Sequence, residues 1–558
     1  MFAIYPTNTT QWVKSVFDRW ADRNELAVYV CGTFIVRCSK RWKISRSEFR
    51  TCFFEGLAFE WPITHFDANR TRHPCLSQAI GHFTSIEVDH SYFTATRSLY
   101  RSTDIFYTII DGSAIICSEL AILVAARGGF SQQQIDTEYC RDFISFQQKF
   151  GGHTAFENIK EVMLGECVTV TPHDQIQARF VNQPIRSDAD IVDMLTETLA
   201  EFTRRFDNTA LMFSGGLDSS TLLWALRSNG TETLVVHAES TADAIESEYE
   251  EAAAVARDMG CEVLQLIPGE SDCHQAFVVD ADSRISSPYD IPLLKPSAPS
   301  FPAAPFDGNT LVLTGHGGDH VFVQNPENNV CFSALRSGRL IPFLKLVRKL
   351  SRLKGKNGFQ VIQDNLRLLL HPDSPPNPAP HWLPLARANL ERAHYLLRDL
   401  DPRSAKHTHL ATILLALHST QAVRGEISSL SPLLLQNVIG HVLATPVEDM
   451  FTDTHDRAII RKLIYAKSGK SFAWRRTKRA SSRWFFELLS RSGDNLLESI
   501  AQSRLLSSLG IHRDSLLAEI EQNCTIALTP NLKHIVNLYK IDAHLRSIAL
   551  QSEKILSS

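Results

Sequence analysis

The feature that most constrains the fold is the stretch Ser214-Gly-Gly-Leu-Asp-Ser-Ser220, which separates an apolar run from a helical run. The apolar run, residues 210–213, predicts a buried strand, and Leu222, Leu223 and Leu226 follow at helical spacing. Two glycines allow a tight turn and a close ligand approach, while a helix start presents unpaired N–H groups and partial positive charge. This order therefore predicts an anion site at the end of a strand.

The residues around this stretch alternate between strand and helix patterns. We expect strands at residues 210–213, 233–237, 263–267 and 310–313. Helices are expected from about Asp218 and over residues 246–259. Such alternation predicts a parallel sheet covered by helices, with ligands at the carboxyl ends of its strands.

The chain before this region has a different pattern. Short β-rich runs at 27–36, 105–116 and 167–170 predict an antiparallel sheet domain. Ser187-Asp-Ala-Asp190 resembles a capping box, and helical spacing then continues to Phe206. Because 558 residues suit two domains, we place a boundary near 185, giving domains 1–185 and 186–558.

Most of the chain beyond residue 330 has a helical pattern. Five prolines interrupt it between His371 and Pro380, and they exclude both a helix interior and a central strand. We expect residues 371–380 to form an exposed connector or lid.

Composition excludes several broad classes of protein. The 57 basic and 61 acidic side chains nearly cancel, so no global field favours nucleic acid or a membrane as the partner. Eleven cysteines without a C-x-x-C pair predict reduced thiols, and no signal peptide or membrane-length apolar run is present. We therefore expect a soluble, cytoplasmic protein.

The first glycine stretch supplies candidate ligands for a phosphate and a cation. Gly215 and Gly216 offer backbone, and the hydroxyls of Ser214, Ser219 and Ser220 are further donors. Asp218 is placed to hold Mg²⁺. The alternative is a plain Gly-Gly turn capped by Asp and Ser. A G-x-x-x-x-G-K-[ST] loop is absent from the sequence, so the usual γ-phosphate loop is not the explanation.

A second glycine stretch, Thr314-Gly-His-Gly-Gly-Asp-His320, follows the expected strand at 310–313. Its candidate nucleotide ligands are Thr314, Gly315, Gly317 and Gly318. Asp319 can share the cation with Asp218 across neighbouring strand ends. The alternative is a glycine turn with a capping Asp. His316 and His320 have no third clustered ligand for a transition metal.

The first stretch is similar to the SGGxDSS pyrophosphatase loop of ATP-dependent adenylating enzymes. Its surroundings resemble the asparagine synthetase B superfamily, which includes β-lactam synthetases and lasso peptide cyclases. The resemblance implies ATP and Mg²⁺ as cofactors, with ATP split between its α- and β-phosphates. It places Phe213 and Val236 beside the nucleotide, although both also fit plain core strands. Where the family has Glu, this chain has His320.

Two catalytic residues are expected from the same resemblance. Glu426 precedes Pro432 by a longer spacing than in asparagine synthetases. Lys478, in Arg475-Arg-Thr-Lys-Arg479, matches the family lysine that contacts the adenylate and the developing oxyanion. The alternative for the basic segment is a solvated helix face or a weak nucleic-acid patch.

Residues 97–107, Asp111-Gly112 and Ser118-Glu119 resemble the glutaminase domain of asparagine synthetases. That domain uses an N-terminal cysteine as nucleophile, whereas position 2 here is Phe, so glutamine hydrolysis should be absent. The resemblance therefore implies an α/β fold class with two parts. The first is an inactive, Ntn-hydrolase-like antiparallel β-sandwich, and the second is a parallel α/β synthetase domain with a helical extension.

The resemblance favours a lasso peptide cyclase. Such an enzyme adenylates an Asp or Glu side chain of a linear core peptide and closes a macrolactam with the peptide's N-terminal amine. The implied partners are that precursor peptide, a leader peptidase and a leader-binding protein, with no membrane or nucleic acid. A β-lactam synthetase or another small-molecule amide synthetase is the alternative, and a tRNA-modifying adenylating enzyme is a third reading. A non-enzymatic regulatory homologue is the fourth, and the presence of both Asp218 and Asp319 argues against it.

Overall fold

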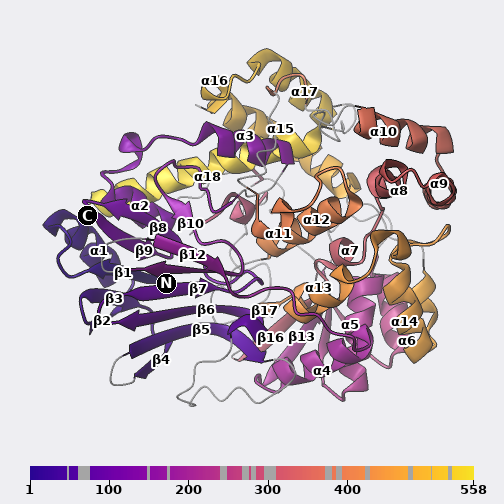
Figure 1. The fold of residues 1–558 in the computed structure, drawn as a ribbon, viewed down its shortest axis with the longest axis horizontal. Coiled ribbons are helices and arrows are strands. Elements are labelled where there is room, and N and C mark those ends of the chain that lie inside the picture. The colour runs from indigo at the N-terminus through magenta and orange to yellow at the C-terminus, as the bar shows by residue number, and fades with distance from the viewer. Residues whose placement is uncertain are drawn as a thin grey trace.

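The computed structural model describes residues 1–46, 50–60, 76–146, 151–171, 176–238, 248–266, 276–277, 285–293, 309–370, 380–384, 393–420, 428–475, 482–503, 505–525 and 531–557. These residues form two six-stranded antiparallel sheets from the N-terminal part and one five-stranded parallel sheet from the later part (Figure 1). The predicted α/β fold class is confirmed.

Both antiparallel sheets enclose a shared apolar core. The first has the order β10-β8-β9-β1-β3-β2, with β1 (Phe2–Pro6), β2 (Ala27–Cys31), β3 (Phe34–Cys38), β8 (Phe106–Ile110), β9 (Ser113–Cys117) and β10 (Lys160–Glu161). The second has the order β12-β11-β7-β6-β5-β4, with β4 (Lys43–Arg46), β5 (Arg50–Glu60), β6 (Ala79–Asp89), β7 (Phe93–Arg97), β11 (Glu166–Val170) and β12 (Ile176–Phe180). Alternate residues such as Phe2 and Ile4 face that core with Phe53 and Ile86, as a pleated strand requires.

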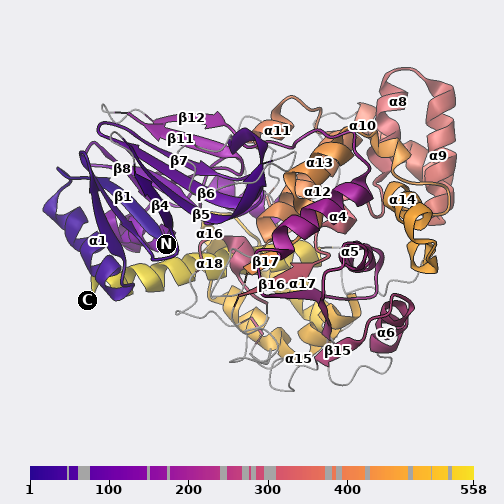
Figure 2. The same ribbon diagram turned by 90° about the horizontal axis from the view of Figure 1, so that it is seen from below.

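Helices from both ends of the chain cover the other face of the first sheet. They are α1 (Gln11–Arg23), α2 (Leu120–Ala126), α3 (Thr137–Phe146) and the C-terminal α18 (Leu532–Leu556). The imidazole of His534 in α18 lies 3.0 Å from the carbonyl of Ile144, and Asn537 donates to the same oxygen. The C-terminus consequently lies beside α1, where Arg23 donates to the carbonyl of Lys554 (Figures 1 and 2).

The parallel sheet has the order β15-β14-β13-β16-β17. Its strands are β13 (Asn208–Met212), β14 (Leu234–Ala238), β15 (Val263–Leu266), β16 (Thr310–Thr314) and β17 (Ser428–Leu430). The four predicted strands are confirmed within two residues at each end, and β17 was not predicted. The order reverses between β13 and β16, and this switch point is where such sheets bind ligands.

The first helix of this region starts later than predicted. In α4 (Ile191–Thr203) the N-cap is Asp190, whose side chain accepts from the amides of Val192 and Asp193 at 2.8 and 3.3 Å. Ser187 instead accepts from the amide of Ala189, so it closes a local turn outside the helix. The capping box with Ser187 as N-cap is therefore wrong, and the helix ends at Thr203 rather than at Phe206.

Helices dominate the rest of the chain, as predicted. They are α5 (Leu217–Ser228), α6 (Tyr249–Asp258), α7 (Gly318–Val321), α8 (Phe332–Arg336), α9 (Leu340–Lys354), α10 (Gly358–Leu370), α11 (Tyr395–Arg398), α12 (Ala405–Ser419), α13 (Gln436–Leu443), α14 (Ala458–Ser468), α15 (Ser482–Ala501), α16 (Leu505–Ser508) and α17 (Arg513–Thr525). Among the described helices, none has the length and apolar character that a membrane crossing requires. Of the expected connector at 371–380, only Pro380 lies within the described residues, and it is buried.

A buried ion network joins the antiparallel part to the rest of the molecule. The guanidinium of Arg101 donates to Asp104 at 2.7 Å and to Asp290 at 2.8 Å. Its second amino group donates to the carbonyls of His418 and Thr420, at the end of α12. Arg101 is 1 % exposed, so these bonds are shielded from water.

Residue 185 lies between β12 and α4, where the proposed domain boundary falls.

We predict that Arg101→Met lowers the stability of the whole chain by about 3–5 kcal/mol, because it removes one partner of a buried charge network. The measurement is the urea midpoint followed by tryptophan fluorescence. Arg50→Met is the control, because the Arg50–Glu87 pair lies at the surface and should contribute little. Equal midpoints for the two variants would contradict a structural role for the network.

Candidate functional site

The first glycine loop lies between β13 and α5, at the predicted strand end. Gly215 has φ +68°, and a Cβ there would lie 2.7 Å from the Cα of Ala252 in α6. Gly216 is the N-cap of α5, and no side chain caps the helix there. A Cβ on Gly216 would meet only the hydroxyl of Ser214 within 4 Å, so this side of the loop is open to a ligand.

The three serines of the loop are placed differently. The hydroxyls of Ser214 and Ser219 lie 3.3 Å apart, and Ser214 is exposed. Ser220 is fully buried, and its hydroxyl has no hydrogen-bond partner among the described residues. Ser219 is buried at 4 % exposure but lies against the exposed Ser214, whereas Ser220 is enclosed by the protein. Contact of Ser214, Ser219 and Ser220 with a phosphate stays a prediction.

The second glycine loop packs directly on the first. Gly317 has φ +88° and is the N-cap of α7, and a Cβ there would lie 2.4 Å from a carbon of Leu434. A Cβ on Gly318 would lie 2.4 Å from the carboxylate carbon of Asp218. A Cβ on Gly315 would lie 3.0 Å from the amide nitrogen of Ser219. The close approach of the two loops therefore requires Gly318 and leaves little room at Gly315, whereas Gly317 is required by its contact with Leu434.

This packing brings the two predicted metal ligands to one point. One guanidinium nitrogen of Arg457 donates to Asp218 at 2.9 Å and to Asp319 at 2.7 Å. Arg457 is 5 % exposed and is the N-cap of α14. Because one nitrogen reaches both carboxylates, a single cation position is within reach of both side chains. From the sequence, Arg457 was noted only as the first residue of the basic stretch 457–462, which resembles the same family segment as Lys478, and it was given no role of its own.

Further polar groups surround Asp319. The amide of Gln324, in the orientation that satisfies both of its ends, donates to the two carboxylate oxygens of Asp319 at 2.7 and 2.8 Å. His316 lies on the other side of the loop, 3.0 Å from the hydroxyl of Ser419, and burial lowers the pKa of its imidazole. No group of three His, Cys, Asp or Glu side chains within the described part of the chain could hold a metal by itself.

Phe213 directly follows β13, and Val236 lies in the middle of the adjacent strand β14. The amide of Phe213 donates to the carbonyl of Val236 at 2.7 Å, and both side chains are buried. The imidazole of His237 is 2.8 Å from the carbonyl of Phe213. The contact of Phe213 and Val236 with a nucleotide stays a prediction.

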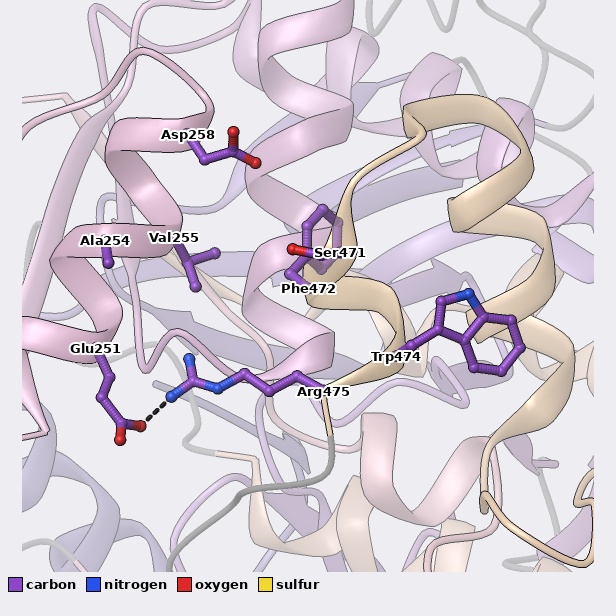
Figure 3. A pocket seen from close by; sticks show the side chains of 8 residues that line it. All are labelled: Glu251, Ala254, Val255, Asp258, Ser471, Phe472, Trp474 and Arg475. Atoms are coloured by element: carbon purple, nitrogen blue, oxygen red, sulfur yellow. Dashed lines mark hydrogen bonds and ion pairs between the residues drawn. The ribbon is translucent and has the colours of Figure 1, made fainter.

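A pocket of about 640 Å³ lies between α6 and the short 3₁₀ segment Ser471–Trp474 (Figure 3). Glu251 of α6 forms an ion pair with Arg475 at its mouth, and Trp474 is directed away from α6 (Figure 3). Arg475 is the last described residue before 476–481, so Lys478 lies outside the described residues. Glu426 lies outside them as well, and both catalytic assignments stay predictions.

Comparison with known proteins identifies the family. A protein-family model described as asparagine synthase matches residues 190–534. The chain belongs to the asparagine synthase family. The Microcin J25-processing protein McjC of Escherichia coli is 28% identical over 396 residues, which are 70% of this chain and 68% of that protein. The predicted superfamily and its resemblance to lasso peptide cyclases are thereby confirmed.

Solved structures add little to this assignment. The allosteric regulatory enzyme of purine biosynthesis is 9% identical, covers 49% of this chain and 81% of its own, and has a TM-score of 0.22. Glutamine phosphoribosylpyrophosphate amidotransferase from B. subtilis is 9% identical, with coverages of 57% and 76% and a TM-score of 0.21. Scores this low carry no argument about a shared fold. Family membership does assign the chain to the ATP-dependent amide-forming ligases.

We predict that Gly318→Ala reduces ATP-dependent turnover at least about a hundredfold, because the new methyl group displaces the Asp218 carboxylate. The matched control is Gly358→Ala, which also adds a methyl group at the start of a helix. There the nearest atoms belong to the flexible side chains of Ser351 and Val347. The measurement is pyrophosphate release by both purified variants. Normal release by the Gly318 variant would contradict the packing of the two loops.

Proposed function

We propose that the protein adenylates an Asp or Glu side chain of a linear peptide and closes a macrolactam with the N-terminal amine of the same peptide. The observation that supports this most directly is the meeting of Asp218 and Asp319 beside the open helix start at Gly216. That arrangement joins a cation site to a phosphate site. Both are needed for cleavage between the α- and β-phosphates of ATP.

The residues at the site fit a magnesium ion. Their two carboxylates approach one cationic nitrogen in the structure, and carboxylate oxygens are the ligands that Mg²⁺ prefers. Two protein ligands suffice, because Mg²⁺ usually keeps several waters and binds substrate phosphates. When bound, the ion would neutralise charge on the departing pyrophosphate.

The protein's own groups account for the rest of the first step. The helix start at Gly216 and the hydroxyls of Ser214 and Ser219 hold the phosphates, and the glycine turns keep side chains out of their way. A substrate carboxylate oxygen attacks the α-phosphorus, the bond to the β-phosphate breaks, and pyrophosphate leaves. In the second step the amine attacks the acyl carbon, loses a proton and displaces AMP.

The choice of a peptide substrate rests on similarity to the microcin J25-processing protein. Phe2 supports an internal amine rather than ammonia, because it is buried in β1 and has no nucleophilic group. A leader peptidase and a leader-binding protein are the proposed partners in the cytoplasm, because a core peptide must be freed before its amine can react. The test is mass spectrometry of a linear core peptide incubated with ATP, where loss of one water and production of AMP are expected.

We predict that Asp218→Asn and Asp319→Asn each reduce pyrophosphate release at least about a hundredfold, because each removes a carboxylate from the cation site. The control is Asp207→Asn, because Asp207 is exposed and precedes β13 at the opposite end of the strand. Circular dichroism checks that the variants fold. Full turnover by either site variant, with metal in excess, would refute the cation site.

For Lys478 we predict that Lys478→Ala leaves ATP binding nearly unchanged but lowers amide formation by about two to three powers of ten, as expected for a group that stabilises transition-state charge. Lys478→Arg should recover only part of the rate, since the planar guanidinium of arginine spreads its charge, whereas the ammonium of lysine concentrates it. Calorimetry measures nucleotide binding, and product formation measures the rate. Near-normal turnover in the alanine variant would move the catalytic cation elsewhere, with Lys462 and Arg476 as the next candidates.

A further inference from the structure

One part of the chain has a charge that differs sharply from the rest. Between Arg336 and Leu370 there are nine Lys or Arg residues and a single acidic residue, Asp364, although the whole chain has a net charge of −4. This segment begins at the last residue of α8 and contains the whole of α9 and α10. Both views place α9 at the edge of the molecule opposite the antiparallel sheets (Figures 1 and 2).

The same segment is unusually apolar at its surface. Of the fifteen large apolar side chains that are exposed within the described residues, seven lie in α9 and α10. They are Leu340, Ile341, Leu344, Phe359, Leu366, Leu369 and Leu370. Single exposed apolar residues are normal, but a cluster of this kind marks an interaction surface.

The exposed residues of α9 lie on one side of the helix. Phe343, Val347 and Leu350 face a small core that also contains Val361 of α10, so the opposite side faces outward. On that outer side Leu340, Ile341 and Leu344 are followed by Lys345, Arg348 and Arg352, at helical spacing. The outer stripe is therefore apolar in its first turns and basic in its last turns.

A basic groove of about 630 Å³ continues the surface on the flank of α9. Lys345, Arg348, Lys349 and Arg352 line one wall, and Lys462 of α14 lies on the other. Asp453 on the second wall pairs with Arg352 at 3.2 Å, and Asp449 is the other acidic group in the lining. Five cations and two carboxylates leave the groove positive.

We propose that the outer faces of α9 and α10 dock on an anionic membrane surface. Basic side chains attract anionic headgroups, and leucine, isoleucine and phenylalanine enter the boundary with the acyl chains. A protein partner fits less well, because the core of a protein interface is depleted in charged residues, whereas basic side chains directly continue the apolar stripe here, and the stripe contains neither Tyr nor Trp. The protein would bind the membrane surface without crossing it. This proposal departs from the expectation of no membrane partner, which rested on the nearly balanced charge of the whole chain.

The test is flotation of the full-length protein with vesicles of phosphatidylcholine alone and of phosphatidylcholine mixed with phosphatidylglycerol. We expect binding to the mixed vesicles only, and weaker binding as salt increases. The variant Arg339→Glu/Lys345→Glu/Arg348→Glu should bind at least about a hundredfold more weakly, because each lost cation removes roughly a fivefold attraction. The variant Leu340→Ser/Ile341→Ser/Leu344→Ser should also release the protein from the vesicles.

A matched control removes the same charge from a distant surface. Lys40, Arg41 and Lys43 are exposed beside β3 and β4, and their triple Glu variant should bind as the wild type does. All variants should keep ATP-dependent turnover, which shows that they fold. The proposal is overturned if the wild-type protein does not bind the mixed vesicles, or if the control variant loses as much vesicle binding as the α9 variant. It is also overturned if the surface captures a protein partner and no vesicles.

Discussion

The site is organised by one ion cluster, in which Arg457 bridges Asp218 and Asp319. Two carboxylates this close repel each other in a poorly hydrated site, so the arrangement requires a cation between them. The position of Arg457 is otherwise unfavourable, because it has φ +51° and lies at the positive end of the dipole of α14. The carboxylate pair is therefore what holds the arginine there.

The strand order and the glycines explain why these carboxylates meet. Because β13 and β16 are neighbours at the switch point, the loops that follow them leave the sheet side by side. A side chain at Gly318 would separate those loops, since its Cβ would collide with Asp218 at the start of α5, and a Cβ at Gly315 would lie only 3.0 Å from the amide nitrogen of Ser219. Because these positions are glycines, the backbone of the second loop can lie directly against the first loop.

The local parts of this site could be predicted, because a strand, a glycine turn and a helix follow one another in the sequence. The meeting of Asp218 and Asp319 could also be predicted, since carboxyl ends of parallel strands share an edge. The role of Arg457 could not be predicted, because it lies 138 residues beyond Asp319 and no local pattern distinguishes it from nearby basic residues. The three-residue strand β17 is too short to show alternation, and its pairing with β16 depends on tertiary contacts.

The antiparallel half supports the site even though it lacks the expected nucleophile. Gln436 is fully buried and exchanges hydrogen bonds of 2.9 and 2.8 Å with the backbone of Gly81 in β6. The hydroxyl of Tyr100 accepts from the amide of Ser431, whose own hydroxyl lies 2.9 Å from that of Thr314. None of these contacts involves Phe2, so replacing a nucleophile there leaves the support of the second glycine loop unchanged. The predicted absence of glutamine hydrolysis is therefore compatible with retention of the whole antiparallel half.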